Sequence, residues 1–558
     1  MAPFRSIYQQ DATKQLVVGV SLLALSAVYS YVFLLNLAPI YGSTPSHIFH
    51  GYGVGIAGAA GWFAKDHIHR LSGRNAVYLV PVVAFWLPVL QYFVSQQSSL
   101  LGNPTGPLIT GIVGLYPLVL LSVASAGKLV QSGLNLNQHG DLVAEHIPLM
   151  GSYVVFAVGE YLAKTFLTRF IGSTVFLSRA GLQILIPVLY AVAIPSKILL
   201  LAIPSLLFSL TYNVHLPLGH TTRALNSAIA EDGFALVARQ DSNTGYVSVL
   251  DNLEDGFRVM RCDHSLLGGQ WIKKRPNYTP PTVKDPIYAV FTMLEAVRLV
   301  ETAHGAPRVD ADSKALVIGL GIGTTPGALI SHGIDTTIVE IDPVVHKFAG
   351  QYFELPSNHT PVIEDARTFV RRNQESANPM QYDYIVHDVF TGGAEPVELF
   401  TYEFIRGLHA SLKDDGVIAI NYAGDITLYP ASLAIRTIKA IFPTCRLFRE
   451  ESDSEVGLDF TNMVIFCTKT PSSSLSPDQG LTFREPVPAD FLGSRFRARY
   501  LVPRHEVDAA RFMAVEKGGR AVLHDKEVKW LHKYQDRGAL EHWGIMRTVL
   551  PERVWEMW

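Results

Sequence analysis

The sequence predicts two unlike halves: a multi-span α-helical membrane domain, and an α/β domain with a parallel sheet that is preceded by a small antiparallel β unit. Charged residues make up only 17% of the 558 residues, against about 25% in an average soluble domain, and the deficit lies in the first 215 residues. Apolar runs alternate with helical patterns between about 315 and 421, which is typical of βαβ units. A glycine-rich turn at 319–324 directly follows the first of those runs.

Composition also predicts where each part of the chain ends. Apolar sequence gives way to strand-like sequence near residue 228, and a run of serine and proline follows residue 470. The polar sequence beyond it contains scattered tryptophans. It could dock on a membrane surface or cover the edge of the sheet, and we expect it to pack on the α/β domain. The expected parts are a transmembrane domain at 1–215, a β unit at 228–285, an α/β domain at 286–470, a linker at 471–483 and a C-terminal extension at 484–558.

Six apolar stretches in the first part approach or exceed the ~20 residues that a helix needs to cross a bilayer. The last stretch is the longest and contains Pro187, Pro195 and Pro204, so it forms either one span with an interfacial helix or a tight pair of short spans. In the second stretch, Gly51 and Gly55 are spaced for close helix packing. We expect six spans, near 15–38, 48–64, 77–97, 106–127, 147–168 and 180–212.

The distribution of basic residues predicts the orientation of these spans. Arg5 and Lys14 precede the first stretch, and no Lys or Arg follows it, which places the N-terminus in the cytoplasm. Six spans then return the second half of the chain to the cytosol. We therefore expect a multi-pass membrane protein with a cytosolic α/β domain, in an organelle that the sequence does not specify. The glycosylation sequons at Asn277 and Asn358 are expected to stay bare.

Three cysteines, Cys262, Cys445 and Cys467, lie in the second half of the chain. Their number is odd and their spacing is not that of a metal site, so we expect neither a disulfide framework nor a bound metal. Reduced thiols suit the cytosol. The net charge of −3 does not attract a polyanion, so nucleic acid is not an expected partner.

Strand and helix patterns can be placed along the second half of the chain. The β unit is expected to have strands at 234–238, 246–250 and 257–260, followed by a helix at 286–302. The α/β domain is expected to have strands at 315–318, 336–339, 361–363, 383–387 and 416–421, with helices at 324–332, 343–353, 366–373 and 400–412. Ligands of such sheets bind beyond the carboxyl ends of the strands.

Glycines and acids fall at that carboxyl edge. Asp388 follows the fourth strand, and His387 beside it should point to the opposite face and be structural. Thr324 stands where the dinucleotide fingerprint has its third glycine, and the resulting spacing resembles the Rossmann-like, class I S-adenosylmethionine (SAM) fold. The turn could instead be a tight βα connection, Glu340 a solvated acid and Asp365 a helix N-cap. The cofactor-binding candidates here are Gly319, Gly321, Gly323, Glu340, Asp342, Glu364 and Asp365.

Longer motifs resemble the spermidine/spermine synthase (polyamine aminopropyltransferase) family over about 235–470. They are Val339-Glu340-Ile341-Asp342-Pro343, Glu364-Asp365-Ala366, Asp285-Pro286-Ile287-Tyr288 and Tyr382-Asp383-Tyr384-Ile385-Val386-His387-Asp388. The resemblance, to the members fused to membrane spans, implies decarboxylated SAM or SAM as co-substrate. It also implies Asp388 and Tyr288 as catalytic residues and Gln270 as a further contact to the nucleoside.

Two positions depart from the family pattern. Family members that make spermidine usually carry an Asp inside the glycine turn and a second Asp three positions after the catalytic one. This chain has Ile322 and Thr391 at those positions. Because those acids help to seat the amine and the aminopropyl group, their absence leaves the transferred group open between aminopropyl and methyl.

The resemblance favours a membrane-anchored, aminopropyltransferase-like enzyme that acts on a small amine. Asp388 would accept the proton of the amine, directly or through Tyr288 or water, because an amine with a pKa near 10.4 needs a base. One alternative is a SAM-dependent methyltransferase acting on an amine or a membrane-borne substrate. The other is a catalytically silent, cofactor-binding membrane scaffold. Besides the amine, the lipid bilayer is an expected partner, and a homodimer is compatible with the sequence.

Overall fold

The computed structural model describes residues 7, 11–72, 76–273, 281–301, 308–389, 396–450, 460–470, 481–515 and 519–558. The chain divides into two compact units, and each is described by itself. Unit 1 comprises Met1–Asp232, Arg239–Tyr246 and Arg547–Trp558, and unit 2 comprises Gly233–Ala238 and Val247–Met546.

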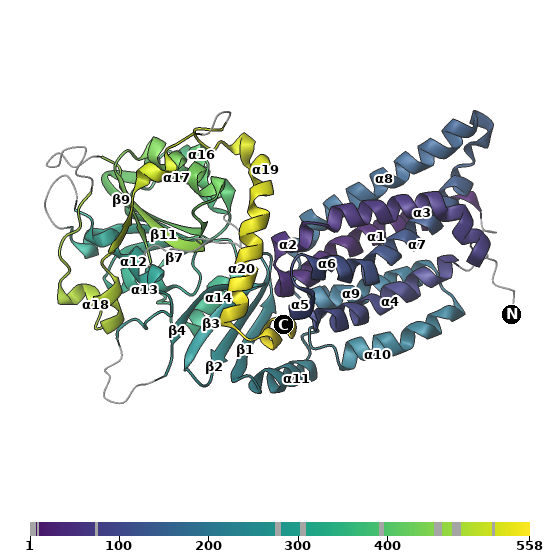
Figure 1. The fold of residues 1–558 in the computed structure, drawn as a ribbon, viewed down its shortest axis with the longest axis horizontal. Coiled ribbons are helices and arrows are strands. Elements are labelled where there is room, and N and C mark those ends of the chain that lie inside the picture. The colour runs from purple at the N-terminus through teal and green to yellow at the C-terminus, as the bar shows by residue number, and fades with distance from the viewer. Residues whose placement is uncertain are drawn as a thin grey trace. The chain divides into compact units, whose positions relative to one another are not determined.

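Unit 1 is built mainly from helices (Figure 1). Among the described residues, four helical segments are long and apolar enough to cross a membrane: Ala12–Tyr41, Ala76–Ser95, Thr105–Leu134 and Asp141–Arg169. The helices are α1 (Ala12–Tyr41), α2 (Ser43–His47), α3 (His50–Ser72), α4 (Ala76–Ser95), α5 (Ser98–Leu101), α6 (Thr105–Thr110), α7 (Tyr116–Leu134), α8 (Asp141–Phe166), α9 (Arg179–Ala193), α10 (Ile203–Thr211) and α11 (Gly219–Ala230).

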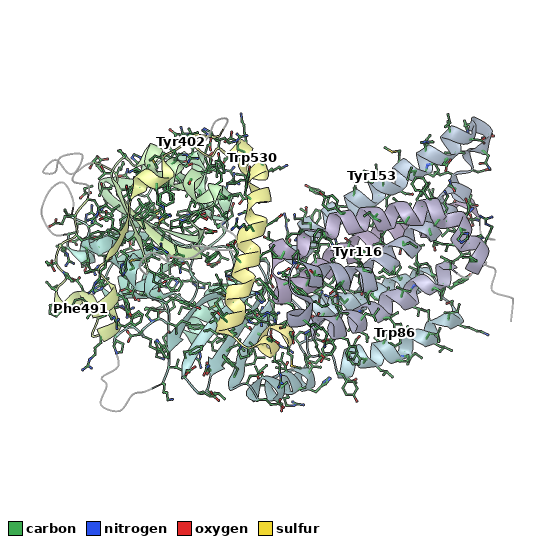
Figure 2. The ribbon with its side chains drawn as sticks, in the orientation of Figure 1. Trp86, Tyr116, Tyr153, Tyr402, Phe491 and Trp530 are labelled. Atoms are coloured by element: carbon green, nitrogen blue, oxygen red, sulfur yellow. A yellow bond between two sulfur atoms is a disulfide. The ribbon has the colours of Figure 1, made fainter. Side chains whose placement is uncertain are left out.

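The last apolar stretch forms two helices instead of one. α9 ends at Ala193, and a 3-10 segment at Lys197–Ala202 leads into α10. Pro195 lies in the break, where its missing N–H and fixed φ disfavour a continuous helix. Both helices pack on α4, and the indole N–H of Trp86, labelled in Figure 2, donates to the carbonyl of Leu201 (3.0 Å). Both arrangements that the sequence left open contain two helices, and the structure has two short ones.

Close packing between α3 and α7 depends on glycines other than the predicted pair. A Cβ at Gly53 would lie 2.1 Å from the ring of Tyr116, and one at Gly61 would lie 2.4 Å from the carbonyl oxygen of Leu120. A Cβ at Gly51 or Gly55 would meet no described atom within 4 Å. The prediction for Gly51 and Gly55 is therefore wrong. Residues two apart on a helix point to opposite sides, so these glycines cannot share the face of Gly53.

A small antiparallel sheet has the strand order β1-β2-β3-β4. Its strands are β1 (Phe234–Asp241), β2 (Tyr246–Asn252), β3 (Phe257–Cys262) and β4 (Ser265–Trp271). The sequence predicted the first three strands. The fourth is harder to recognise because Gly268 and Gly269 interrupt its side-chain pattern.

The large sheet has the order β12-β10-β11-β9-β8-β5-β6-β7. The five strands from β5 to β9 are parallel, and the order reverses at β5. Most of these five strands begin and end within two residues of their predicted bounds, whereas β9 is longer than predicted at both ends. The strands are β5 (Lys314–Ile318), β6 (Asp335–Glu340), β7 (Thr360–Ile363), β8 (Tyr382–His387), β9 (Leu412–Asp425), β10 (Cys445–Arg449), β11 (Phe460–Thr468) and β12 (His505–Val507).

Helices cover both faces of this sheet (Figure 1), so the predicted Rossmann-like architecture is confirmed. One face packs on α15, α16 and α17 through a core that includes Phe369, Phe404 and Ile435. The other face packs on α12 and α13 through Val290 and Leu329, and α14 packs on the small sheet. The helices are α12 (Ala289–Leu294), α13 (Thr324–Ser331), α14 (Pro343–Tyr352), α15 (Ala366–Glu375), α16 (Tyr402–Ser411) and α17 (Tyr429–Ile441).

The C-terminal extension covers the edge of the large sheet. β12 pairs with β10, and Arg436 on α17 donates hydrogen bonds to four backbone carbonyls between 512 and 521. Residues 547–558 belong to unit 1, where Trp558 stacks on His215. Most of the predicted linker at 471–483 lies outside the described residues. The helices of the extension are α18 (Arg495–Tyr500), α19 (Val528–Leu531), α20 (Gln535–Val549) and α21 (Glu552–Glu556).

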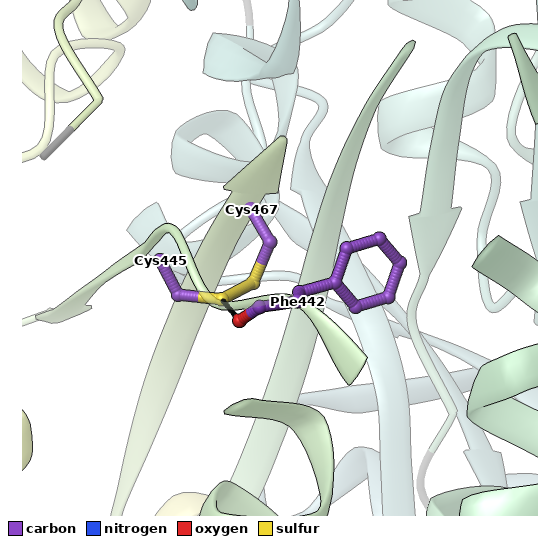
Figure 3. The surroundings of a disulfide bond; sticks show 3 residues. All are labelled: Phe442, Cys445 and Cys467. Carbon is purple, nitrogen blue, oxygen red and sulfur yellow. Dashed lines mark hydrogen bonds between the residues drawn. A yellow bond between two sulfur atoms is a disulfide. The ribbon is translucent and has the colours of Figure 1, made fainter. Parts of the chain in front are cut away.

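A disulfide joins Cys445 on β10 to Cys467 on β11 (Figure 3). The two residues are direct partners in the antiparallel register, and the Sγ of Cys445 lies 3.1 Å from the carbonyl oxygen of Phe442. Cys262, the third cysteine, is not part of this disulfide. The expectation of three reduced thiols is therefore wrong, because an odd count does not prevent two cysteines on neighbouring strands from pairing.

Candidate active site

The glycine turn after β5 is held between two neighbouring segments. Gly319, Gly321 and Gly323 have φ values of 84°, 53° and 88°, which glycine adopts without strain. A Cβ at Gly319 would lie 2.0 Å from the carbonyl oxygen of Asp388, and one at Gly321 would lie 2.4 Å from that of Leu267. Glycine is thus required for the shape of the turn. It is also required because two backbone segments approach the turn closely: Asp388, which follows β8, and Leu267, which lies within β4.

Gly319→Ala is expected to damage both stability and activity. The added Cβ would force the backbone of Asp388 to move, and the positive φ adds strain, so we expect a loss of about 1–3 kcal/mol together with a large loss of turnover. Thermal unfolding and an activity assay measure the two effects. Gly333→Ala is the matched control, since Gly333 also has a positive φ (89°) but a Cβ there meets no described atom within 4 Å. Equal activity of the two variants would contradict this account of the turn.

Glu340, at the end of β6, is buried. It exposes 8% of its surface, and its Oε2 and Oε1 accept hydrogen bonds from the N–H groups of Leu320 (3.0 Å) and Asp342 (2.8 Å). Burial raises the pKa of Glu340 to about 7. Each carboxylate oxygen has a second lone pair for a further donor. The arrangement suits the two hydroxyls of a ribose, and the alternative of a solvated strand-end acid does not hold.

The other predicted acids make structural contacts. Asp342 is 1% exposed, and its Oδ1 accepts hydrogen bonds from two N–H groups in the first turn of α14. This geometry favours a capping role for Asp342 over direct contact with a ligand. Asp365 is exposed and caps α15, as the N-cap alternative predicted, and Glu364 pairs with Arg372. All three lie beyond the carboxyl ends of β6 and β7, beside Glu340.

Asp388 follows β8 and lies on the face of the sheet that α12 covers, because the residues two and four before it belong to that core. The side-chain N–H of Asn421, on β9, donates to its Oδ1 (2.9 Å). Burial raises the pKa of Asp388 to about 6, a value suited to accepting a proton near neutral pH. His387 points to the opposite face, where its ring contacts Phe400 and Phe404, as predicted for a structural residue.

Tyr288 lies at the start of α12, next to two polar residues on the same face of the sheet. Glu450, which follows β10, accepts hydrogen bonds from the N–H of Ala289 (2.7 Å) and from the side chain of Asn462 on β11 (3.4 Å). Burial, with a smaller contribution from the charge of Glu450, raises the pKa of Tyr288 to about 12. Tyr288 therefore stays protonated at neutral pH and is a hydrogen-bond donor.

The buried polar atoms that have no hydrogen-bond partner in the described part of the chain include Nε2 of Gln270 and Oδ1 of Asn421. Both residues are at most 5% exposed, and Gln270 forms a backbone bridge to Pro286 just before α12. A buried polar group without a partner costs free energy, so these atoms indicate a polar ligand. Together with the glycine turn and Glu340, they fit a nucleoside sulfonium compound.

Sequence reasoning missed three of these residues: Asn421, Glu450 and Asn462. Asn421 was the last residue of the predicted strand 416–421, and a polar residue at that end of a parallel strand was a usable signal. Glu450 follows β10 and Asn462 lies on β11, two strands that were not predicted. The departure at Ile322 is now explained structurally, since its side chain packs against Gly268 in the core. Thr391 lies outside the described residues.

Comparison with known proteins identifies the family. Residues 301–448 match the family model described as the spermine/spermidine synthase domain. The whole chain is 77% identical, over 564 aligned positions that cover 100% of both sequences, to an N-terminal histidine N-methyltransferase of Emericella nidulans. The chain belongs to the family of that protein. It is therefore a transferase, and its co-substrate is SAM or the decarboxylated form of SAM.

Other relatives match only part of this chain. A polyamine aminopropyltransferase of Vibrio vulnificus is 34% identical over 151 residues, which is 26% of this chain and 49% of the relative. Spermidine synthase from Thermotoga maritima covers 44% of this chain and 75% of its own, with 18% identity and a TM-score of 0.31. Human methyltransferase-like protein 13 covers 39% and 93%, with 22% identity and a TM-score of 0.27. The family model confirms the predicted family resemblance for residues 301–448, whereas the full-length match favours the methyltransferase alternative over aminopropyl transfer.

Proposed function

We propose that this chain transfers the methyl group of SAM to a nitrogen of an amino-terminal histidine in a polypeptide. The observation that carries the proposal is the 77% identity along the whole chain to a relative named for that reaction. The structure of the glycine turn supports it. Ile322 is 4% exposed and packs in the core, so that position offers no carboxylate for a polyamine.

The chemistry needs a nitrogen lone pair in line with the methyl–sulfur bond. As the nitrogen–carbon bond forms, the carbon–sulfur bond breaks and its electron pair neutralises the sulfonium, so the leaving thioether needs no proton. The acceptor loses one proton. An imidazole has an ordinary pKa near 6.5 and an α-amine one near 7.7–8.0, so a weak base suffices. Asp388 accepts that proton, and Tyr288 contributes a hydrogen bond from its hydroxyl.

The test uses the purified full chain in detergent and a short peptide that begins with histidine. We expect the peptide to gain one methyl group and S-adenosylhomocysteine to form when the donor is SAM. The same peptide with alanine in the first position and histidine in the second is the control, and it should stay unmodified. Methylthioadenosine formed from decarboxylated SAM, with an aminopropylated amine as the second product, would overturn the proposal in favour of aminopropyl transfer.

We also propose that unit 1 spans a membrane. Its four long apolar segments have mean hydropathies between 1.4 and 2.1. In Asp141–Arg169 only 11% of the apolar window is buried, which leaves side chains such as Met150 and Tyr153, the latter labelled in Figure 2, largely exposed. Lipid is the solvent that suits apolar side chains exposed along a helix of this length.

The orientation of the membrane helices can be tested at Asn358. If the last of the six predicted stretches crosses twice, through Arg179–Ala193 and through Lys197–Thr211, the number of crossings is seven instead of six, and the α/β domain lies opposite the N-terminus. The disulfide between Cys445 and Cys467 favours such an oxidising compartment over the cytosol expected from the sequence. We therefore expect the exposed sequon at Asn358 to carry sugar, seen as an endoglycosidase-sensitive mobility shift that Asn358→Gln abolishes. A bare Asn358 together with alkylatable thiols at Cys445 and Cys467 would instead support the cytosolic orientation.

A further inference from the structure

Asp425, the last residue of β9, is a buried carboxylate with one unused oxygen. The residue is 1% exposed. Its Oδ1 accepts hydrogen bonds from the backbone N–H (2.8 Å) and the hydroxyl (2.6 Å) of Thr427. Its Oδ2 is buried and has no hydrogen-bond partner in the described ranges. A buried carboxylate oxygen without a donor is costly, so this atom suits a hydrogen-bond donor that the described residues do not provide.

The position of Asp425 connects it to the proposed reaction centre. Asp425 and Asn421 are four residues apart on β9 and therefore point to the same face, with Cα atoms about 13 Å apart along an extended strand. Asn421 holds Asp388 through its side-chain N–H.

A second buried acceptor reaches this region from α20. Phe460 is the partner of Asp425 in the register of β9 and β11, and the ring of His542 on α20 lies 5.8 Å from the ring of Phe460. Glu541, next to His542, has a buried Oε2 without a described hydrogen-bond partner. Its Oε1 accepts a hydrogen bond from the Nε of Arg537 (2.9 Å), and Arg537 is also close enough to Asp425 to feel its charge.

We infer that Asp425 and Glu541 bind the α-ammonium group of the acceptor polypeptide. The inference rests on the proposed function, because it assigns the part of the acceptor that Asp388 does not contact. An ammonium group has three N–H donors and a positive charge, and the two unused carboxylate oxygens supply matching acceptors and a negative charge. Arg537 carries a competing positive charge at the same place. The site thus selects a free amino terminus and rejects one that is acetylated.

The test compares two peptides of the same sequence that begin with histidine and carry a fluorophore at the carboxyl end. One has a free amino terminus and the other is N-acetylated. Fluorescence anisotropy with the full chain in detergent, saturated with S-adenosylhomocysteine, gives both dissociation constants. We expect the wild type to prefer the free amino terminus by about 10- to 100-fold, the range of one hydrogen bond to a charged group.

Asp425→Asn and Glu541→Gln should each abolish most of that preference. These substitutions keep the oxygen that accepts from Thr427 or Arg537 and remove only the charge. Arg537→Gln should have the opposite effect and tighten binding of the free-amino peptide. Asp414→Asn is the matched control, because Asp414 is 91% exposed and pairs only at the surface with Lys469. Unchanged thermal midpoints and unchanged affinity for S-adenosylhomocysteine exclude misfolding of the variants.

Failure of this inference is distinguishable from failure of the proposed function. A wild type that methylates the free-amino peptide while Asp425→Asn and Glu541→Gln keep the full preference would overturn the ammonium site and leave the methyl-transfer proposal intact. Equal affinity of the wild type for the two peptides would overturn it as well. A wild type that prefers the free amino terminus, loses the preference in both variants and yet methylates neither peptide would support the site and overturn the proposed reaction.

Discussion

Asp388→Asn is expected to lower kcat for methyl transfer by about 10²- to 10⁴-fold, the usual contribution of a positioned general base. The affinity for S-adenosylhomocysteine should change little, because the nucleoside contacts lie on Glu340 and the glycine turn. Asparagine keeps the size of the side chain and can still hydrogen-bond to Asn421. Single-turnover kinetics and calorimetric titration with S-adenosylhomocysteine measure the two quantities. Retained turnover in the variant would remove the role of Asp388 as the base.

The same substitution has a consequence for stability that depends on pH. Burial raises the pKa of Asp388 from 3.8 to about 6, so the folded state favours the protonated form. The relative stabilisation is therefore fully present below about pH 4 and is lost as the pH rises through about 6. At pH 8 the charged carboxylate costs less than about 3 kcal/mol, because Asp388 is partly exposed and solvent screens its charge.

Asp388→Asn should consequently raise the thermal midpoint at pH 8 and change it little at pH 4. The wild-type rate constant for transfer should rise with pH, with an apparent pKa near 6. Thermal unfolding of wild type and variant at the two pH values, together with a pH–rate profile, checks both expectations. A variant that is less stable than the wild type at pH 8 would contradict the burial of an unfavourable charge at this position.

Arg497→Met is expected to destabilise unit 2 by about 3–5 kcal/mol, which is the cost of leaving one partner of a buried ion pair uncompensated. Arg497, on α18, donates two hydrogen bonds of 2.9 Å to the carboxylate of Glu295, and neither side chain is more than 2% exposed. Burial already raises the pKa of Glu295, and Arg497 opposes that effect. Removing the guanidinium leaves the buried carboxylate of Glu295 without this compensating charge. Glu295 directly follows α12, the helix that Tyr288 precedes.

The measurement is thermal unfolding of the full chain, with a fall of roughly 10 °C or more expected for the transition of unit 2. Replacing both partners, as Glu295→Leu with Arg497→Met, should recover much of the loss because neither charge of this pair remains. Arg446→Met is the matched control. It breaks a pair with Glu506 whose side chains are 29% and 46% exposed, and it should cost less than about 1 kcal/mol. Equal costs for the two arginines would show that the extension does not anchor α12.

Local sequence pattern was sufficient for the elements that build the carboxyl edge. The runs at 315–318, 336–339 and 383–387 became β5, β6 and β8, since each is a short apolar stretch bounded by turn residues. Glu340 and Asp388 could be predicted as site residues because parallel strands bring their carboxyl ends to one edge of the sheet. This holds independently of the rest of the fold. Their burial could not be found, because it depends on packing by the small sheet and the extension.

Features that depend on partners distant in the sequence could not be predicted in this way. The pairing of Cys445 with Cys467 follows from the register of β10 and β11, two strands that were not among those predicted. The role of Asn421 depends on its hydrogen bond to Asp388, a residue on another part of the chain. The transferred group was open for a different reason: aminopropyl and methyl transfer share the same glycine turn and the same acids, so those motifs do not separate the two reactions.

The most direct test of the account is a structure of the full chain with S-adenosylhomocysteine bound. We expect the ribose hydroxyls to lie within hydrogen-bonding distance of the carboxylate of Glu340, the backbone of the glycine turn to contact the nucleoside, and the sulfur to face the side of the sheet that carries Asp388 and Tyr288. A nucleoside bound away from the carboxyl edge of the sheet, or an Asp388 carboxylate turned away from the sulfur, would contradict the account.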